Sequence, residues 1–511
     1  MSGRSKVRSR KLLNWRATRW VALAALVPVL WACNARRLAQ PTPAPEGTFI
    51  DSFQQSINRD LDIVFMVDTS QSMAKLQKKL TTNFPTFMNV LKNLPGGLPN
   101  VHIAVVSSDI GAGAYDVTDI PGCRHGGDQG VFQTAPKGTT CGTGMLNAGE
   151  HFISNVNGQA NYTGDIADVF SCIAALGDQG CGFEHQFGSV LRALGADGNG
   201  GAPPENANFL RPNAYLAVVM ITNEDDCSAP INSMFFNPSS RYVSDPLGPL
   251  TSYRCNEFGH LCGGQPPTRM PAAGGTVYTG MCVSAEDGKL LRVRDVADAL
   301  RALKPGEPGK VLVAAIAGPA GPTDKYVVKP TTPTLTDDPS QWPAVDHSCE
   351  QASDETYADP AVRIKEWVDA FGGNGVFQPI CNASFEPALQ RIAEEIGKRL
   401  GTPCVEGKLL NKDGVLLTNL ATETPDCTVV DHAKNDQGKI VNTPLPQCAG
   451  NVMGGATACW YLENGGTGCG MGHTMKFHRP GGPVTTELNS SVACSVLVCP
   501  PAGTPNPPQG C

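Results

Sequence analysis

The chain alternates between short, almost continuous apolar runs and longer segments in which apolar residues recur every three or four positions. The first pattern predicts buried strands and the second predicts amphipathic helices. The predicted strands are 61–68, 101–109, 214–226, 310–319 and 375–381. The predicted helices are 72–94, 182–194, 290–303, 361–371 and 385–400. This alternation indicates an α/β domain with a doubly wound, mostly parallel sheet covered on both faces.

Local features modify this pattern along the chain. Pro85 lies inside the first predicted helix and is expected to kink or divide it. Segments 110–180 and 227–288 lack the alternation, are rich in Gly, Pro and Cys, and read as inserts. Both follow strand ends, the edge at which open α/β sheets bind their ligands.

The pattern changes again after Cys404. The segment 404–511 contains eight cysteines and few apolar runs. This composition predicts a small disulfide-rich module of β type. The stretches "WYLEN" and "SVACSVLVC" are its best strand candidates.

The first 32 residues have a pattern that is typical of a targeting segment. A basic head precedes a 13-residue apolar run, 20–32, which is too short to span a bilayer. We therefore expect a signal peptide over 1–32. Its end, "VLWAC", resembles the bacterial lipobox, which implies that Cys33 carries lipid and anchors the mature chain to a membrane. The alternative is ordinary secretion with cleavage elsewhere.

The segment 33–55 follows as a Pro- and Ala-rich, lipid-anchored tether. Asn34 comes directly after the candidate lipid-bearing cysteine. By resemblance to Gram-negative lipoproteins, a residue other than Asp at this position implies sorting to the outer membrane. The protein would then face the periplasm or the cell surface.

Cysteine usage indicates an oxidising compartment. The chain has 19 cysteines, and 18 remain once Cys33 is set aside, an even number that suits a disulfide framework. Connectivity cannot be deduced from the sequence, but short separations favour the pairs Cys123/Cys141, Cys172/Cys181, Cys255/Cys262 and Cys494/Cys499. Further disulfide candidates are Cys227, Cys282, Cys349 and Cys381.

The charge balance narrows the class of partner. The leader carries seven Lys and Arg residues and no acids, so the mature chain has 33 basic against 47 acidic residues. The resulting net charge of −14 argues against nucleic acid as a partner.

Three oxygen-bearing residues directly follow the first buried strand. Asp68, Ser70 and Ser72 form the pattern D-x-S-x-S between that strand and the next helix. Alternate spacing in a tight loop can aim one carboxylate and two hydroxyls at a single divalent cation. The alternative is that Asp68 caps the helix and the serines lie in a turn.

With this motif at a strand end, the chain resembles the von Willebrand factor A domain over about residues 56–402, and we assign the domain to 56–403. The stretches "FSCIAALGDQGCGFEHQ" and "ITNEDDCS" resemble bacterial lipoprotein members with cysteine-bearing inserts. The resemblance implies a doubly wound sheet and a metal-ion-dependent adhesion site that holds Mg²⁺ or Ca²⁺.

Two departures from the family pattern concern the other ligands. The family supplies a Thr before a middle helix, where this chain has Glu184 as the nearest oxygen-bearing candidate. The family also places an Asp after its fourth strand, where this chain has Asn223 followed by Glu224, Asp225 and Asp226. These acids can substitute as ligands, or they form a helix first turn and a solvated turn. The site is therefore intact, altered or lost.

These patterns favour a binding module over an enzyme. No P-loop, G-x-S-x-G or H-E-x-x-H motif is present. We expect a lipid-anchored envelope protein that binds a protein or polysaccharide partner through the cation. The alternatives are a structural scaffold of an envelope assembly with a degenerate metal site and, less favoured, a secreted hydrolase.

Overall fold

The computed structural model describes residues 48–497 apart from short gaps. The gaps are 55–58, 95–96, 121, 231–232, 281, 334–337, 339, 401–403, 406, 421, 435–438, 453–456, 465–472 and 481–488. The predicted signal peptide, Cys33 and Cys499 lie outside the described residues. In the part that is described, no helix combines the length and apolar content needed to cross a bilayer.

A seven-stranded sheet forms the centre of the α/β domain. Its strand order is β17-β12-β8-β2-β3-β5-β6. The five predicted strands make its parallel part, and β5 and β6 add an antiparallel edge. The strands are β2 Asp60–Val67, β3 Asn100–Ser107, β5 Ile153–Val156, β6 Gln159–Ala160, β8 Tyr215–Ile221, β12 Val311–Ala317 and β17 Gly375–Pro379. The doubly wound α/β fold predicted from the sequence is confirmed.

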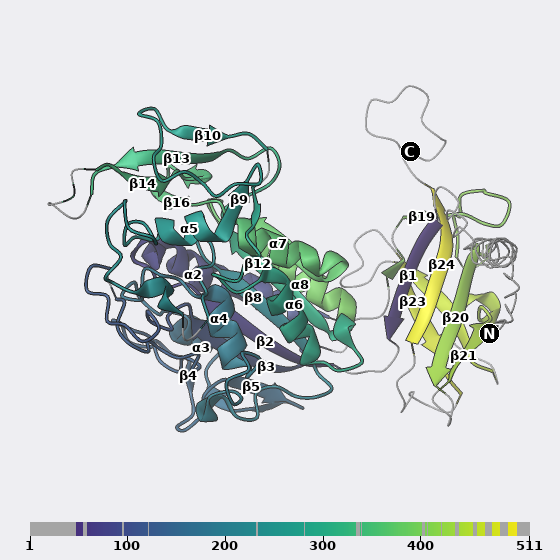
Figure 1. Ribbon diagram of the computed structural model, residues 1–511. Coiled ribbons are helices and arrows are strands. Elements are labelled where there is room, and N and C mark those ends of the chain that lie inside the picture. The colour runs from purple at the N-terminus through teal and green to yellow at the C-terminus, as the bar shows by residue number, and fades with distance from the viewer. Residues whose placement is uncertain are drawn as a thin grey trace, which may run out of the picture.

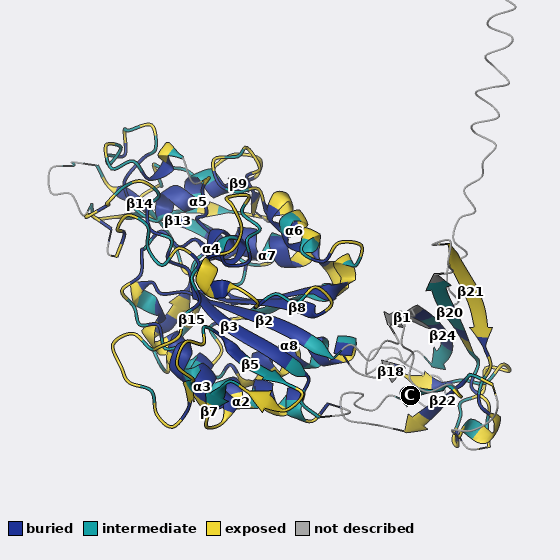
Figure 2. Ribbon diagram, turned by 90° about the horizontal axis from the view of Figure 1, so that it is seen from below, coloured by how far each residue is buried: buried dark blue, intermediate teal, exposed yellow. Residues whose placement is uncertain are grey.

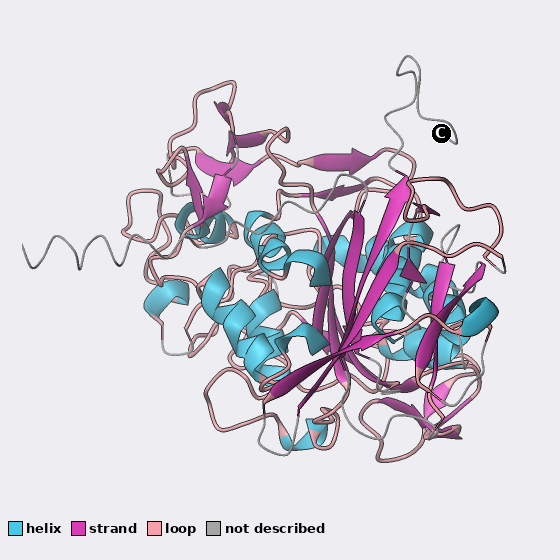
Figure 3. Ribbon diagram, turned by 90° about the vertical axis from the view of Figure 1, so that its right-hand side faces the viewer, coloured by secondary structure: helices cyan, strands magenta, loops and turns pink. Residues whose placement is uncertain are grey.

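Helices cover both faces of this sheet, as Figure 3 shows. Alternate residues of β2 point to opposite faces: Phe65 belongs to one buried core and Met66 to the other. The first face is covered by α2 Ala74–Lys92, α3 Ile166–Ile173 and α8 Glu386–Leu400. The second is covered by α4 Gln186–Ala193, α6 Val293–Ala302 and α7 Val362–Ala370. Figure 2 shows the central strands as buried between these layers.

Helix α2 runs without interruption through Pro85. The expectation that Pro85 divides this helix is therefore wrong, while the alternative expectation of a kink stays a prediction. Pro85 is exposed, while the neighbouring Phe84, Phe87 and Met88 are buried against the sheet. Packing of this apolar face outweighs the loss of one backbone hydrogen bond at the proline.

The predicted insert 110–180 is partly core. It contributes β5 and α3, together with the short strands β4 Met145–Leu146 and β7 Tyr162–Thr163. The insert 227–288 holds α5 Tyr253–Gly259, β9 His260–Cys262, β10 Thr276–Tyr278 and β11 Cys282–Ser284.

A third insertion, which the sequence did not predict, lies between β12 and α7. It holds β13 Tyr326–Thr331, β14 Trp342–Val345, β15 Cys349–Gln351 and β16 Thr356–Ala358. Strand β13 pairs with β10 of the second insert and with β14, so these two insertions share a three-stranded sheet.

The C-terminal module is of β type, and its two predicted strand stretches are confirmed as β22 and β24. It contains β18 Cys404–Val405, β19 Lys408–Leu409, β20 Cys427–Lys434, β21 Ile440–Leu445, β22 Cys459–Asn464, β23 His473–His478 and β24 Asn489–Leu497. An apolar cluster that includes Val429, Trp460 and Met475 forms its own small core.

The segment predicted as a tether supplies one strand of this module. Strand β1, Thr48–Gln54, pairs along its whole length with β24, as Figure 1 shows. The assignment of 48–54 to a tether is therefore wrong. The C-terminal sheet takes its edge strand from residues that precede the α/β domain in the chain, so the module is not continuous in sequence.

The disulfides differ from the local pairs favoured by short separation. The described residues contain seven: Cys123–Cys181, Cys141–Cys172, Cys227–Cys255, Cys262–Cys282, Cys349–Cys381, Cys427–Cys494 and Cys448–Cys459. None of the four predicted pairs forms within this set. Pairing follows proximity in the fold: Cys427 and Cys494 lie on adjacent strands, for example, and are direct partners in the ladder between β20 and β24.

Candidate functional site

The candidate ligands lie at the centre of the sheet, where β2 and β8 run side by side. From β2, the sheet extends through β3 on one side and through β8 on the other. Open α/β sheets bind ligands at such a switch in strand order, at the carboxyl ends of the strands. We call this edge between β2 and β8 the crevice. Asp68 directly follows β2 and Thr222 directly follows β8, so both reach this crevice.

Asp68 is fully buried and is held by donors from three loops. Its Oδ1 accepts hydrogen bonds from the Ser70 amide at 2.7 Å and the Ser108 hydroxyl at 3.3 Å. Its Oδ2 accepts one from the Thr222 hydroxyl at 2.6 Å. Burial raises the pKa of Asp68, and these hydrogen bonds oppose the rise.

The two serine hydroxyls of the motif meet each other and Asn223. Ser70 Oγ lies 3.3 Å from Ser72 Oγ. Ser72 Oγ lies 3.1 Å from Oδ1 and 3.0 Å from Nδ2 of Asn223, so it can donate to the first atom and accept from the second. The D-x-S-x-S loop and Asn223 are therefore in direct contact.

Glu184 and Glu224 form a carboxyl pair beside Asp68. Burial, together with the charges of Glu224 and Asp68, raises the pKa of Glu184 well above its usual range. Burial and the charges of Asp359 and Asp68 raise the pKa of Glu224 to about 8, although a hydrogen bond with Glu184 opposes this rise. Glu184 is 1% exposed, and its buried Oε1 has no hydrogen-bond partner. These shifts favour the protonated forms of the pair.

Asp225 supports the fold instead of facing the crevice. Its Oδ2 accepts from the Arg363 amide at 2.8 Å and its Oδ1 from the Ile364 amide at 3.1 Å. These two bonds satisfy two backbone amides in the first turn of α7, as an N-cap side chain does. His260 Nε2 lies 2.7 Å from the same Oδ2. We therefore do not count Asp225 among the candidate ligands.

The carboxylate of Asp226 is likewise already bonded to other groups of the protein. Its Oδ1 accepts from the Phe187 amide at 2.9 Å, in the first turn of α4. Its Oδ2 forms a fully buried ion pair with Nη2 of Arg363 at 3.2 Å. Asp226 thus joins α4 to α7, and it too is not counted among the candidate ligands.

The third insertion brings residues to the crevice that sequence reasoning missed. The Tyr357 carbonyl accepts from Nδ2 of Asn223 at 3.2 Å, and the Asp359 amide donates to the Asn223 carbonyl at 2.8 Å. The His347 ring stacks on Tyr357 at 3.9 Å between centroids and lies 2.7 Å from Oδ1 of Asp359. Nothing in the local sequence indicated that this insertion folds back to the sheet. Thr222, by contrast, could have been found, because it directly follows a buried strand.

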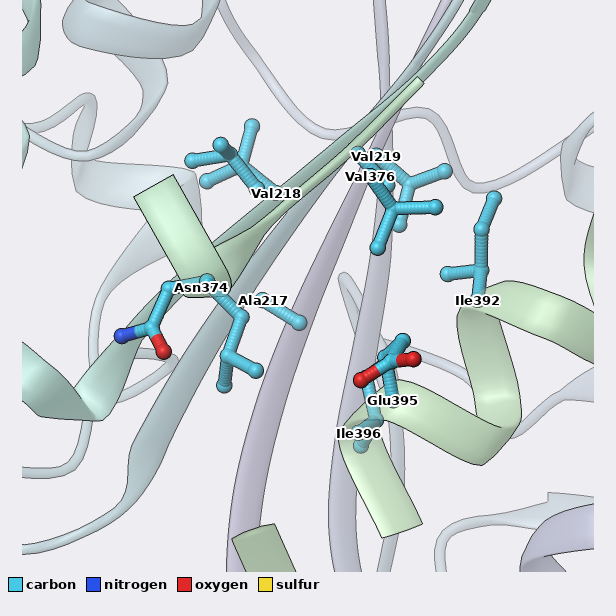
Figure 4. Close-up of a pocket in the computed structure, with 12 residues that line it drawn as sticks. Ala217, Val218, Val219, Asn374, Val376, Ile392, Glu395 and Ile396 are labelled. Carbon is cyan, nitrogen blue, oxygen red and sulfur yellow. The ribbon is translucent and has the colours of Figure 1, made fainter. Parts of the chain in front are cut away.

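The described residues contain no group of three or more His, Cys, Asp or Glu side chains arranged to hold a metal ion. A cation at the crevice would therefore have to use serine hydroxyls beside carboxylates. A separate cavity between the sheet and α8, shown in Figure 4, has a volume of only about 10 Å³ and is lined mainly by aliphatic side chains such as Val219, Val376 and Ile392. It has room for about one water molecule and adds no ligand site.

The comparisons with known proteins do not decide the function of this chain, so its assignment rests on the geometry of the site. No protein-family model and no curated protein matches the chain. Among solved structures it is similar to a von Willebrand factor type A protein from Catenulispora acidiphila, with 9% identity and a TM-score of 0.25, over 89% of this chain and 67% of that chain.

Two solved pilus proteins are similar at the same level. The pilus adhesin SpaC from Lactobacillus rhamnosus GG has 12% identity and a TM-score of 0.29, over 91% of this chain and 42% of that chain. The adhesive tip pilin GBS104 from Group B Streptococcus agalactiae has 8% identity and a TM-score of 0.26, over 88% of this chain and 81% of that chain. Because these TM-scores are low, we base the proposed function on the residues of the crevice.

Proposed function

We propose that this chain is a binding protein of the von Willebrand factor A type that holds a divalent cation in the β2/β8 crevice and uses it to bind a protein partner. The observation that carries the proposal is the carboxyl cluster of Asp68, Glu184 and Glu224. Burial raises the pKa values of all three, and the charges of neighbouring acids raise those of Glu184 and Glu224 further. Buried carboxylates without a counter-charge are costly unless a proton or a cation compensates them.

The donor set fits Mg²⁺ or Ca²⁺. Both cations prefer oxygen ligands, and the crevice offers the hydroxyls of Ser70 and Ser72 and the unpartnered Oε1 of Glu184. Asp68 and Glu224 add negative charge beside them. The bound cation would supply a positive centre with an open coordination position for a carboxylate of the partner.

We place the protein at the cell envelope, anchored by lipid on Cys33 and sorted to the outer membrane. The disulfides of the described residues support export, because such bonds form in oxidising compartments. Membrane fractionation tests the anchor. The wild type is expected with the membranes, and a Cys33→Ser variant in the soluble fraction. Equal membrane recovery of both would contradict lipid anchoring.

The second candidate is a structural scaffold with a degenerate metal site. Two observations favour it. Asn223 replaces the family's Asp, and the hydrogen bond between Glu184 and Glu224 satisfies part of the carboxyl cluster without a metal. A catalytic role is less favoured, because the sequence contains no P-loop, G-x-S-x-G or H-E-x-x-H motif.

A binding assay on envelope fractions separates these functions. The purified, immobilised protein is expected to retain a partner in Mg²⁺ and to release it in EDTA. Ser70→Ala and Glu184→Gln should abolish retention, while Ser171→Ala on helix α3 should not. Retention that is unchanged by EDTA and by both crevice variants would favour the scaffold.

A further inference from the structure

An exposed aromatic residue lies at the rim of the crevice. Tyr357, from the third insertion, is 37% exposed and is the only exposed Phe, Tyr or Trp in the part of the chain that the structure describes. Its carbonyl accepts from Nδ2 of Asn223 at 3.2 Å. Burial and the charge of Glu224 raise the pKa of its hydroxyl, and a hydrogen bond with Ser72 opposes this rise. Tyr357 therefore adjoins the proposed cation site and can also be reached from solvent.

The third insertion orders this ring before any partner binds. The His347 ring stacks on it with 3.9 Å between centroids and an angle of 21° between the ring planes. His347 is fixed in turn, because its Nδ1 lies 2.7 Å from Oδ1 of Asp359. The disulfide Cys349–Cys381 joins the insertion to the segment that follows β17. An aromatic side chain that is already ordered loses little conformational entropy when a partner packs against it.

The turn before Tyr357 is also tied to helix α2, which follows the D-x-S-x-S motif. Lys79 Nζ lies 2.6 Å from Oδ2 of Asp354, and both of these side chains are partly buried. Lys75 Nζ lies 2.9 Å from Oε2 of Glu355 at the surface. These contacts fix the position of Tyr357 relative to the motif. A partner that uses both the cation and the ring must therefore present its two contacting groups at a set spacing.

A partner carboxylate that completes the coordination of the cation brings its neighbouring residues close to Tyr357. Tyr is enriched among the residues that dominate binding energy at protein interfaces. A ring on the partner gains most here, because aromatic rings attract each other in edge-to-face or offset stacked arrangements beyond the effect of buried area. We propose that Tyr357 selects protein segments in which aromatic residues adjoin the carboxylate residue. This specificity rests on the proposed function, since the cation holds the carboxylate.

Calorimetric titration with short peptides in Mg²⁺ tests this proposal. The probes are Gly-Phe-Asp-Phe-Gly, Gly-Gly-Asp-Gly-Gly and Gly-Phe-Asn-Phe-Gly, all blocked at both ends so that no terminal carboxylate is present. The wild type is expected to bind the Phe-Asp-Phe peptide at least about threefold more tightly than the Gly-Asp-Gly peptide. Tyr357→Ala should remove this preference, and Tyr357→Phe, which keeps the ring, should retain it. A matched control is Tyr461→Ala in the C-terminal module, which should keep the wild-type preference.

The outcomes distinguish this inference from the proposed function. A wild type that binds no Mg²⁺, or that binds the Phe-Asn-Phe and Phe-Asp-Phe peptides equally, contradicts cation-mediated binding and with it the specificity that depends on it. A wild type that binds Mg²⁺ but binds the two Asp peptides equally, or binds neither, overturns the role of Tyr357 alone. An unchanged preference in folded Tyr357→Ala does the same.

Discussion

The Thr222 hydroxyl donates a 2.6 Å hydrogen bond to Oδ2 of Asp68 and so joins the carboxyl ends of β8 and β2. Both residues are fully buried. The same Thr222 oxygen accepts from the Glu224 amide at 3.2 Å. One threonine therefore fixes both the acid that opens the D-x-S-x-S motif and the loop that carries Glu224.

Replacing Thr222 with Val keeps the shape of the side chain but removes this donor. The buried Asp68 carboxylate then loses one of its three hydrogen bonds, so we expect a loss of about 1–3 kcal/mol of stability. Urea unfolding measures the effect. Thr222→Ser, which retains the hydroxyl, should remain within about 1 kcal/mol of the wild type. Equal losses in both variants would show that packing, and not the hydroxyl, matters here.

The buried ion pair between Asp226 and Arg363 should be essential to the domain. Both side chains have 0% exposure, so Arg363→Met leaves a buried carboxylate without its counter-charge and should cost about 3–5 kcal/mol. The control lies on the same helix: Lys365 pairs with Asp369 at the surface, and Lys365→Met should change stability by less than about 1 kcal/mol. Denaturant midpoints of the two variants give the comparison, and similar midpoints would contradict this role.

The metal-free protein should lose stability as the pH rises. The folded-state pKa of Glu224 is about 8, against a usual value of 4.5, so the native state holds a proton that the unfolded chain releases. The stability that this proton provides is complete below about pH 4.5 and is lost progressively towards pH 8. In EDTA, Glu224→Gln should raise the melting temperature relative to the wild type more at pH 8 than at pH 5. A difference that does not change with pH would contradict the shifted pKa.

The edge strand β1 should be needed by the C-terminal module and not by the α/β domain. Deleting 48–54 removes the ladder to β24 and leaves that strand with an unpaired edge. We expect faster proteolysis within 404–497 and an unchanged melting transition of the α/β domain. Deletion of the seven preceding residues that do not reach the strand, 40–46, is the control. Equal proteolysis of the two deletion variants would contradict the pairing.

Much of the fold could be predicted because buried parallel strands produce a strong local signal. Residues 61–68 are apolar almost throughout, and the structure places them at the centre of the sheet as β2. The pairing of Cys123 with Cys181, across 58 positions, could not be predicted in this way. Nor could the pairing of β1 with β24 from opposite ends of the chain. Both depend on contacts between distant segments that leave no local pattern.

The same distinction applies to the candidate site. Asp68, Ser70 and Ser72 occupy alternate positions of one short loop and could be predicted from this spacing. Asp225 appeared equivalent to Glu224 in the sequence, yet its carboxylate holds the first turn of α7. Tyr357 arrives from an insertion more than 280 positions away from the motif. Which acids face the crevice therefore depends on tertiary structure alone.

The central claim is that the crevice binds a divalent cation, and calorimetric titration of the purified protein with Mg²⁺ and Ca²⁺ at pH 8 tests it most directly. We predict saturable binding of one cation per chain, accompanied by a rise in melting temperature, since a ligand that binds the native state stabilises it. Ser70→Ala and Glu184→Gln should lose this binding, and Ser171→Ala should retain it. Absence of binding by the wild type, or equal binding by the Ser70→Ala and Glu184→Gln variants, would contradict the account.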